Sequence, residues 1–432
     1  MTPTRYLYMY DVAQSKATKL NITNDPKGYG AIWEYQLTAP SYESIMADDT
    51  ENIAYVLAPY AAVYRFTVTD NSTGDATLTE ITGSGWDPYT VKMTPGNSNQ
   101  MWIGTDMGFF NCSDMKTASG YGMTALYNGM QGLLSTQMSQ HPTDANQVMV
   151  GAQDNGISLY NGSASFTQLE AADGYNCLYN WNDPTKAFFN INGTSYIMTL
   201  SGTTAAQQSN TKLINGDWSE HMIETAPYNP SSPSDANFLV WGGNTAPHVS
   251  TDFGTNWAKV PATGYNYGGG ITAAEVVSPT KFFAGTDKGD VYLLENSGGT
   301  WTPTKITSEP FPSGREVYEI EYIPGSNNEI YVSLQPGGTQ IWYYDGSSWN
   351  DRGSGLNHST LFRALAADPD NSSVVYAGGD QGVYYSDDKG ATWTRFFTGM
   401  GPASVQDLGF HPTTKKLRAL AWGKGLYEFN KN

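Results

Sequence analysis

The chain has 432 residues, of which 39% are hydrophobic and 15% are charged, and its formal net charge is −18. This acidic balance, without a basic stripe or an arginine-rich run, argues against a surface that binds nucleic acid. No long amphipathic helical pattern is present, whereas 29 tyrosines and 46 glycines suit short strands joined by many turns, so we predict an all-β protein.

Short strands alternate with turns along the whole chain, and matching positions recur about every 40–50 residues, a period typical of four-stranded propeller blades. We name the strands of each repeat A to D, from the centre of a ring outward. Residues 5–11 and 17–22 resemble a C–D hairpin without inner strands. Eight fuller repeats are expected at 44–81, 89–111, 135–169, 187–214, 238–257, 271–306, 317–349 and 362–397, and residues 405–429 begin a last repeat that stops after C.

The two incomplete ends predict how the chain closes on itself. Joining the N-terminal hairpin to the C-terminal strands would remove both open sheet edges, which otherwise favour aggregation. We therefore predict one β-propeller domain over residues 1–432, with about nine (8–10) four-stranded blades. Two smaller propellers are the alternative. Residues 228–235, rich in Pro and Ser, also fit a surface loop inside a repeat, so they mark no boundary.

Two turns share the spacing Ser-x-Asp-x-Gly-x-Thr/Asn-Trp. In such a turn the carboxylate accepts hydrogen bonds from backbone N–H groups, Gly takes the left-handed conformation, and Trp packs the hairpin onto the sheet. Asn256 replaces the Thr in one of them. The predicted structural residues are Ser250, Asp252, Gly254 and Trp257 in the first turn and Ser386, Asp388, Gly390 and Trp393 in the second.

These turns resemble the Asp-box (BNR) repeat of a β-propeller superfamily that includes sialidases, oligoxyloglucan-type endoglucanases and the sortilin ectodomain. Residues 151–156, Gly-Ala-Gln-Asp-Asn-Gly, are similar to a segment of secreted bacterial members, and the resemblance is clearest from 129 to 432. It implies a propeller fold with the Asp boxes on C–D hairpins, at the rim opposite the binding face. The Asp-box carboxylates are therefore expected to be structural.

In a propeller the B–C and D–A connections share one face, where we expect binding residues. The B–C turns repeat an aspartate close to a glycine, at Asp106, Asp154, Asp287 and Asp380, and turn chemistry alone explains this as well. The D–A loops combine aromatic and charged residues, which suit sugars or a protein interface but also blade packing. The candidate ligand-binding residues are Trp86, Asp87, Asp154, Asp173, Tyr175, Tyr265, Tyr267, Arg315 and Glu316.

Enzyme activities of the superfamily were tested against the residues present. A sialidase needs three converging arginines, and no such triad is recognisable here. Xyloglucanase-like members place two propellers around a cleft, whereas we predict one propeller. The five histidines lack metal-ligand spacing, and no phosphate loop is visible, so we expect no metal and no cofactor. Cys112 and Cys177 are expected to be buried and free rather than part of a disulfide framework.

The leading hypothesis is a non-catalytic binding or adhesion propeller of a secreted or virion-exposed protein, which recognises a glycan or protein ligand through its loop face. One alternative is an endo-acting, xyloglucanase-like glycoside hydrolase that uses paired carboxylates, for example from Asp87, Asp154, Asp173 and Glu316. Another is a structural component of a larger assembly such as a virion, in contact with other chains. No signal peptide and no bilayer-spanning apolar run are visible, so we expect no membrane insertion.

Overall fold

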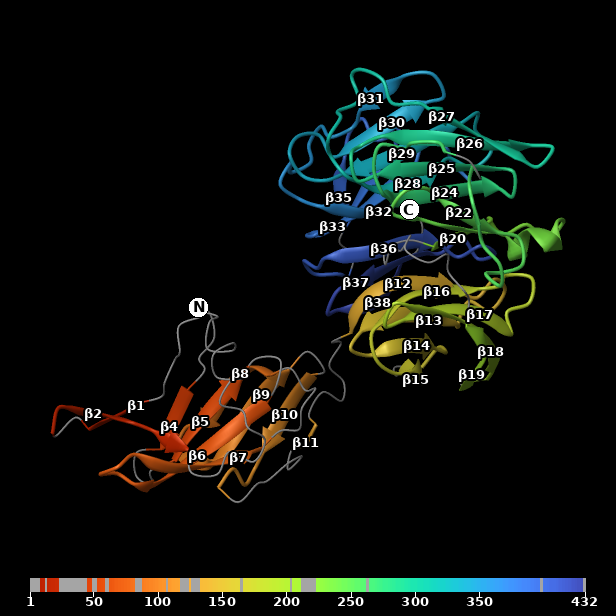
Figure 1. The fold of residues 1–432 in the computed structure, drawn as a ribbon. Helices are drawn as coiled ribbons and strands as arrows, with labels where there is room; N and C mark the ends of the chain where they lie inside the picture. The colour runs from red at the N-terminus through yellow and green to blue at the C-terminus, as the bar shows by residue number, and fades with distance from the viewer. Residues whose placement is uncertain are drawn as a thin grey trace. The chain divides into compact units, whose positions relative to one another are not determined.

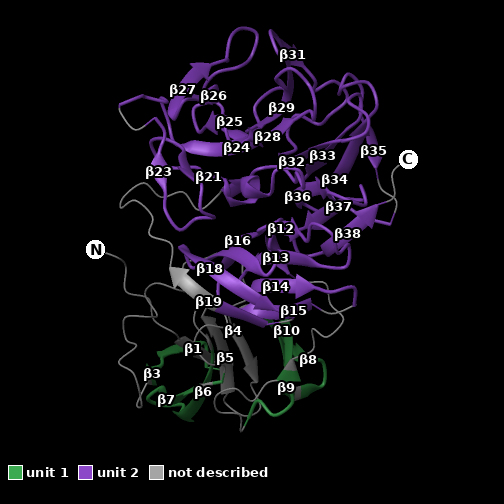
Figure 2. Ribbon diagram, turned by 90° about the vertical axis from the view of Figure 1, so that its right-hand side faces the viewer, with its two compact units in different colours: residues 1–132 green, residues 133–432 purple. Residues whose placement is uncertain are grey.

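The computed structural model is all-β, as predicted, and consists of many antiparallel sheets of the β-propeller kind (Figure 1). The chain divides into two compact units, residues 1–132 and 133–432 (Figure 2). Each unit is described by itself, so the prediction of one propeller domain through 1–432 stays a prediction. The structure describes residues 8–11, 14–22, 45–48, 53–58, 62–81, 88–105, 108–116, 124–125, 133–163, 166–202, 204–210, 223–261, 264–396 and 399–429.

The described residues of the first unit form a hairpin and two larger sheets. Buried apolar side chains, among them Val63, Ile103 and Phe110, pack the two larger sheets together. The hairpin is β1 (Tyr8–Asp11) with β2 (Lys16–Lys19). The five-stranded sheet is β3 (Asn21–Ile22), β7 (Asp75–Glu80), β6 (Ala62–Asp70), β5 (Ile53–Ala58) and β4 (Ile45–Asp48); the four-stranded sheet is β11 (Thr124–Ala125), β10 (Gly108–Cys112), β9 (Asn97–Thr105) and β8 (Pro88–Thr94).

In the described part of the second unit, seven antiparallel sheets follow one another in chain order. We call the first strand of each sheet its inner strand. The inner strands are β12 (Leu134–Gln140), β16 (Gly174–Tyr179), β20 (Ile223–Thr225), β24 (Ile271–Ser278), β28 (Val317–Tyr322), β32 (Phe362–Ala367) and β36 (Val405–Phe410).

The remaining strands of each sheet lie outside its inner strand and complete the hairpins. The second strands are β13 (Val148–Gln153), β17 (Lys186–Ile191), β21 (Leu239–Trp241), β25 (Lys281–Thr286), β29 (Glu329–Leu334), β33 (Val375–Gly379) and β37 (Leu417–Ala421). The third are β14 (Gly156–Tyr160), β18 (Thr194–Ser201), β22 (His248–Ser250), β26 (Val291–Ser297), β30 (Ile341–Asp345), β34 (Gly382–Ser386) and β38 (Gly425–Phe429). The fourth, described in six sheets, are β15 (Phe166–Glu170), β19 (Thr204–Asn210), β23 (Ala258–Lys259), β27 (Thr300–Lys305), β31 (Trp349–Asp351) and β35 (Thr394–Phe396).

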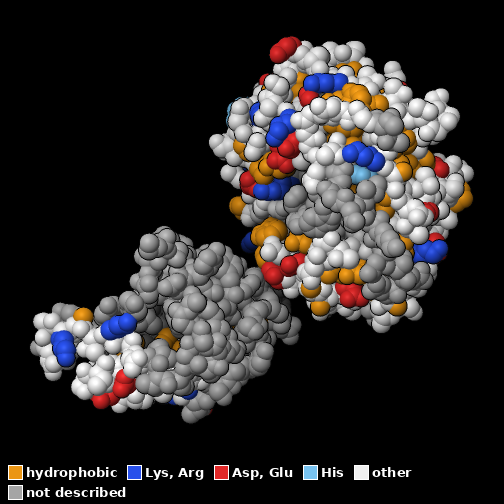
Figure 3. All heavy atoms as spheres, viewed as in Figure 1, with side chains coloured by type: hydrophobic (Ala, Val, Ile, Leu, Met, Phe, Trp, Pro, Cys, Tyr) orange, Lys and Arg blue, Asp and Glu red, His pale blue; other side chains and the backbone are white. Residues whose placement is uncertain are grey.

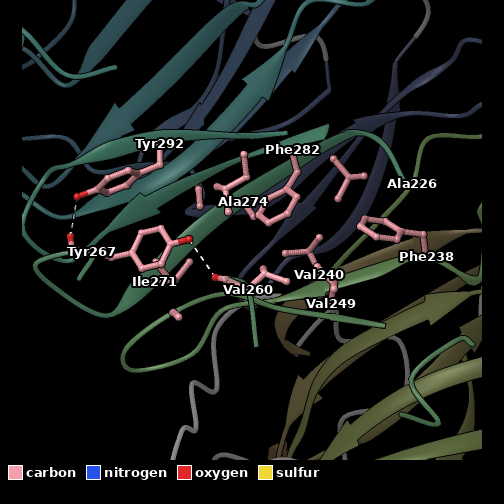
Figure 4. Close-up of a cluster of buried hydrophobic side chains, with 14 residues drawn as sticks. Ala226, Phe238, Val240, Val249, Val260, Tyr267, Ile271, Ala274, Phe282 and Tyr292 are labelled. Carbon is pink, nitrogen blue, oxygen red and sulfur yellow. Dashed lines mark hydrogen bonds between the residues drawn. The ribbon is translucent and has the colours of Figure 1, made fainter. Parts of the chain in front are cut away.

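Neighbouring sheets of the second unit are held together by apolar side chains from their facing surfaces. Figure 4 shows one such cluster, in which Phe238 and Val240 of the third sheet pack near Ile271 and Phe282 of the fourth. The buried Tyr267 hydroxyl donates to the Val260 carbonyl at 3.0 Å, so the polar atom of this aromatic ring is satisfied inside the cluster. This packing explains why strands too short to be stable alone form one compact body.

The seventh sheet contacts the first sheet of the same unit. The Met138 backbone N–H of β12 donates to Asp407 Oδ2 of β36 at 2.7 Å, and Gln140 Nε2 donates to the Gly409 carbonyl at 3.1 Å. The fully buried Arg418 of β37 donates to Gln140 Oε1 at 2.9 Å and to the Ala145 carbonyl. The C-terminal strands thus find their partner at β12, and the predicted closure through residues 5–22 is not confirmed.

The predicted repeats agree with the described strands of the second unit except in its second and third sheets. In the second sheet the inner strand β16 at 174–179 precedes the predicted repeat 187–214, whose last residues 211–214 lie outside the described residues, and the fourth strand is β19 at 204–210. In the third sheet the inner strand β20 at 223–225 likewise precedes the predicted repeat 238–257. Gly174 and Asn176 have low strand propensity, so the sequence did not predict β16. Packing against the neighbouring strands overrides this weak local preference. Cys112 and Cys177 are both buried and free, as expected.

Candidate functional site

All inner strands of the second unit begin at the same side of their sheets. Because neighbouring strands are antiparallel, the turns between second and third strands lie at that side too, together with the connections that enter the inner strands. We call this side the loop face. A cavity of about 600 Å³ lies toward it, lined by residues from all seven inner strands. Its volume falls within the range of roughly 300–1,000 Å³ that is usual for small-molecule sites.

Six carboxyl groups line this cavity: Glu316, which precedes β28, and five that lie within inner strands, Glu224, Glu275, Glu319, Glu321 and Asp407. Burial away from bulk water, followed by repulsion from the other carboxylates, raises the pKa of Glu224 to about 8. The same causes raise the pKa of Glu275 and Glu319 well above the ordinary value. Burial also raises the pKa of Glu321, and it raises that of Asp407 to about 6. At neutral pH the cavity therefore holds protonated and ionised carboxyl groups side by side.

Three of these carboxyl groups join one sheet to the next. Asp407 accepts the Met138 N–H, as described above, and Glu321 Oε1 accepts the Ala367 N–H of β32 at 2.7 Å. Glu275 Oε1 accepts the Tyr322 N–H of β28 at 3.4 Å. Each bond runs from an inner strand to the inner strand of the following sheet, so these carboxyl groups have a structural role beside any chemical one.

Glu224 and Glu319 differ from the other three. Among the described residues neither carboxyl group has a hydrogen-bond partner, and the pKa of each is raised by burial and neighbouring charge alone. They are the cavity acids that remain available to a bound molecule. Within the described ranges, no group of three or more His, Cys, Asp or Glu side chains is arranged to hold a metal ion.

A polar network lies at the seventh and sixth sheets on the loop face. Arg363 Nη1 is 2.5 Å from Asp380 Oδ1 and 3.3 Å from Ser404 Oγ. Ser404 Oγ donates to Asp380 Oδ1 at 3.0 Å, and Gln406 Nε2 donates to Ser404 Oγ at 2.9 Å. Arg363 and Gln406 line the cavity, and the ion pair with Arg363 outweighs burial and lowers the pKa of Asp380. The turn residue Asp380 thus fixes a cation beside the cavity.

Of the residues predicted from the sequence, Tyr175 and Glu316 line the cavity. Asp154 and Asp173 lie together because the Asp154 N–H donates to Asp173 Oδ1 at 3.0 Å, and Asp154 adopts the left-handed conformation with φ 60°. These two aspartates therefore take part in fixing two loops of the first and second sheets.

The other predicted residues are not brought together at the cavity. Tyr265 is 38% exposed, while Tyr267 is fully buried in the cluster of Figure 4. Arg315 donates to the Gln335 and Thr339 carbonyls, a role in holding a loop. Trp86, Asp87 and also Asp106 lie outside the described residues.

The two Ser-x-Asp-x-Gly turns lie between third and fourth strands, at the side opposite the loop face. In the second turn the Gly390 N–H donates to Ser386 Oγ at 2.8 Å, and Asp388 Oδ1 accepts the Thr392 N–H at 2.8 Å. Gly390 has φ +79°, and Trp393 Nε1 donates to the Arg352 carbonyl at 2.7 Å. The first turn repeats these bonds through Ser250 Oγ, Asp252 Oδ1 and the N–H groups of Gly254 and Asn256, and Trp257 Nε1 donates to the Gly254 carbonyl.

The sequence reasoning found Glu316 but missed the five cavity acids that lie within inner strands, because it searched the loops and not the strands. The signal that could have revealed them is the alternation Val-Tyr-Glu-Ile-Glu-Tyr at 317–322, which places Glu319 and Glu321 on one face of an inner strand. On the outer surface, Figure 3 shows acidic and basic side chains interspersed on the visible described face of the second unit. No helix in the described ranges has the length and apolar character to cross a bilayer.

No family model matches this chain. A xyloglucanase from Paenibacillus sp is 27% identical in an alignment of 182 residues that covers 38% of this chain and 16% of that protein. A GH74 enzyme from Niastella koreensis is similar in structure, with a TM-score of 0.58 and 17% identity over 98% of this chain and 62% of that chain. A GH74 xyloglucanase from Xanthomonas campestris has a TM-score of 0.50 and 17% identity over 69% and 52%. The chain therefore spans only part of these relatives, and the structural likeness supports the propeller fold.

Proposed function

We propose that this chain is an extracellular, carbohydrate-active propeller protein of the Asp-box kind that acts on a xyloglucan-type β-glucan as a glycoside hydrolase. The observation that carries the proposal is the sequence similarity to the Paenibacillus xyloglucanase. It moves the hydrolase ahead of the binding protein that the sequence alone favoured. The cavity of the second unit is the site in which we place the bound sugar, because it has both the size and the carboxyl groups for this chemistry.

Glycoside hydrolysis needs one carboxylic acid that protonates the departing oxygen and one carboxylate that acts as a base or nucleophile. Burial, followed by repulsion from the neighbouring carboxylates, holds the pKa of Glu319 well above its ordinary value, which favours the protonated form and suits the role of acid. With a pKa raised to about 6, Asp407 is largely ionised at pH 7 and suits the role of base. The two pKa values differ because neighbouring carboxylates add to the effect of burial at Glu319, whereas backbone N–H bonds from Met138 and Leu408 oppose burial at Asp407.

The test is release of reducing ends from xyloglucan, from mixed-linkage β-glucan and from soluble cellulose derivatives by the full chain. The wild type should cleave xyloglucan, and Glu319→Gln should lower kcat by about 10²–10⁴-fold, the usual contribution of a general acid. Asp388→Asn, at the opposite side of the sheets, is the matched control and should keep the wild-type rate. Cleavage that is unchanged in Glu319→Gln would exclude this acid, and no cleavage by the wild type would exclude the hydrolase.

Binding of the same glycan without cleavage is the second candidate function. It is favoured by the bonds that Asp407, Glu321 and Glu275 make to backbone N–H groups, which is how carboxyl groups serve structure rather than catalysis. Affinity electrophoresis in gels that contain each polysaccharide separates the cases. Retarded migration without released ends would support a binding protein, and neither retardation nor release would favour a protein ligand or a role in a larger assembly.

A further inference from the structure

We propose that Trp422, together with Gln406, forms a subsite on the loop face that holds one β-linked glucose ring at the edge of the cavity. The inference rests on the proposed function and adds to it the residues that would orient the sugar chain. It starts from the observation that Trp422 is 38% exposed, although most large aromatic side chains of the described second unit are packed between sheets.

The backbone holds Trp422 in a fixed place beside the polar network. Trp422 follows β37 in the turn to β38, so it lies on the loop face. Its N–H donates to the Ser404 carbonyl at 2.8 Å, and the next N–H, of Gly423, donates to the Leu133 carbonyl at 2.9 Å. A side chain anchored at two successive backbone bonds is positioned before any ligand arrives, which lowers the entropy lost on binding.

Backbone pairing places Trp422 near the edge of the cavity. Trp422 follows the last residue of β37, and its N–H bond to the Ser404 carbonyl sets it opposite the residue that precedes β36. Gln406 and Asp407 of β36 line the cavity. The indole ring therefore lies on the loop face, close to the part of the cavity wall that the seventh sheet supplies.

Ser404 connects Trp422 to two polar side chains that line the cavity, Gln406 and Arg363. Ser404 holds Trp422 through its carbonyl and receives the Gln406 amide at its hydroxyl, while Arg363 is 3.3 Å from the same hydroxyl. With its Nε2 engaged by Ser404, Gln406 keeps its side-chain oxygen available as an acceptor for a ligand hydroxyl. An exposed aromatic ring whose backbone partner, Ser404, also binds an amide and a guanidinium suits a pyranose ring, whose faces carry C–H groups and whose edge carries hydroxyls.

The chemistry favours glucose units joined through β-linkages. Their substituents are equatorial, so both ring faces are flat and apolar and can stack on an indole, whereas axial hydroxyls would lift the ring from it. Glu224 and Glu319, from the third and fifth sheets, line the same cavity and offer hydrogen-bonding groups to further units of the chain. The ligand expected at this subsite is thus a linear β-glucan segment that enters the cavity past Trp422.

The experiment is calorimetric titration of the full chain with cellohexaose and with a xyloglucan oligosaccharide, using wild type, Trp422→Ala, Trp422→Phe and Gln406→Ala. Trp422→Ala should raise Kd at least about tenfold, Trp422→Phe should recover part of the loss, and Gln406→Ala should raise Kd about three- to tenfold, since it loses one polar contact. Lys424→Ala, an exposed change in the same turn, controls for disturbance of the turn, and thermal unfolding controls for folding.

Tyr265→Ala tests a competing location, because Tyr265 is equally exposed, at 38%, and was predicted from the sequence. A Kd that rises for Tyr265→Ala but not for Trp422→Ala would move the subsite to the entrance of β24 and overturn the inference. Wild-type binding with an unchanged Kd in Trp422→Ala would overturn the subsite and leave the proposed function intact. A wild type that binds neither oligosaccharide would overturn both.

Discussion

Carboxyl groups occupy two contrasting places in the second unit, the cavity near the loop face and the Ser-x-Asp-x-Gly turns at the opposite side. In the turn, hydrogen bonds from the backbone and side chain of Thr392 lower the pKa of Asp388. In the first turn burial raises the pKa of Asp252, but the bonds from Asn256 and Ser250 outweigh it and the pKa is lowered. In the cavity burial dominates, and the pKa of Glu224 rises to about 8.

The comparison shows that the number of N–H donors, set against the loss of water, decides what a carboxyl group does. Asp388 has a dedicated set of donors from its own turn, so it is ionised and its role is local structure. Glu224 and Glu319 have no such donors among the described residues and remain ready to share a proton with a ligand. Charge alone does not mark a functional carboxyl group; a carboxyl group without donors, in a cavity, is the better mark.

Glu428 represents a third environment, in which a carboxylate is paired with two cations. It is held by Lys416 at 2.6 Å and by the buried Arg418 at 2.8 Å, and these cations outweigh burial and lower its pKa. Arg418→Leu should reduce the free energy of unfolding by about 3–5 kcal/mol, because it also leaves the Ala145 carbonyl and Gln140 without their donor between the seventh and first sheets. Urea unfolding measures this loss, and Lys416→Met, on a more exposed cation, is the control with an expected loss below about 1 kcal/mol. A loss for Arg418→Leu no larger than that of the control would contradict the role of Arg418.

The cavity predicts a stability that falls as pH rises. Glu224 has a folded-state pKa above its unfolded value, so its contribution is complete below about pH 4.5 and is lost as pH rises toward 8, where the unfolded chain is ionised and the folded one is not. A pKa unit corresponds to about 1.4 kcal/mol. After allowance for water in the cavity, Glu224→Gln should gain about 2–3 kcal/mol over the wild type between pH 5 and 8. Urea unfolding at pH 5, 6.5 and 8 checks this; a difference between the two proteins that does not change with pH would remove the basis of the comparison.

For Asp388 in the second Ser-x-Asp-x-Gly turn we expect a smaller stabilisation with the opposite dependence on pH. The pKa of Asp388 is lowered, so its stabilisation is present above its unfolded value of 3.8 and is lost as pH falls through the folded value. Because this side chain is exposed, Asp388→Asn should lose about 1 kcal/mol at pH 7. The difference from wild type should close in acid, and glycan binding should stay unchanged. Thermal unfolding of both proteins at pH 7 and pH 3 gives the stability difference at each pH. An equal loss of stability at both pH values would show that the charge of Asp388 does not cause the effect.

Much of the second unit could be predicted from local patterns. Strand alternation and the Gly and Asp turns located seven repeats between residues 135 and 429, matching the seven described sheets, because hairpins and their turns depend on residues close in sequence. The same reasoning proposed the loop face as the binding side and selected Tyr175 and Glu316, which line the cavity. It failed at β16, whose Gly174 and Asn176 read as a loop until packing on its neighbours decided otherwise.

The sequence by itself determined most strands of the second unit, their turns and the left-handed glycines of the two Ser-x-Asp turns, since each depends on the conformational preferences of a few adjacent residues. Only the tertiary structure decided that β36 meets β12 and that Glu224, Glu275, Glu319, Glu321 and Asp407 share one cavity. These acids come from strands up to 183 residues apart, by the difference between positions 407 and 224. Their pKa values depend on the water that packing removes and on the charges that packing gathers, and neither can be read from adjacent residues.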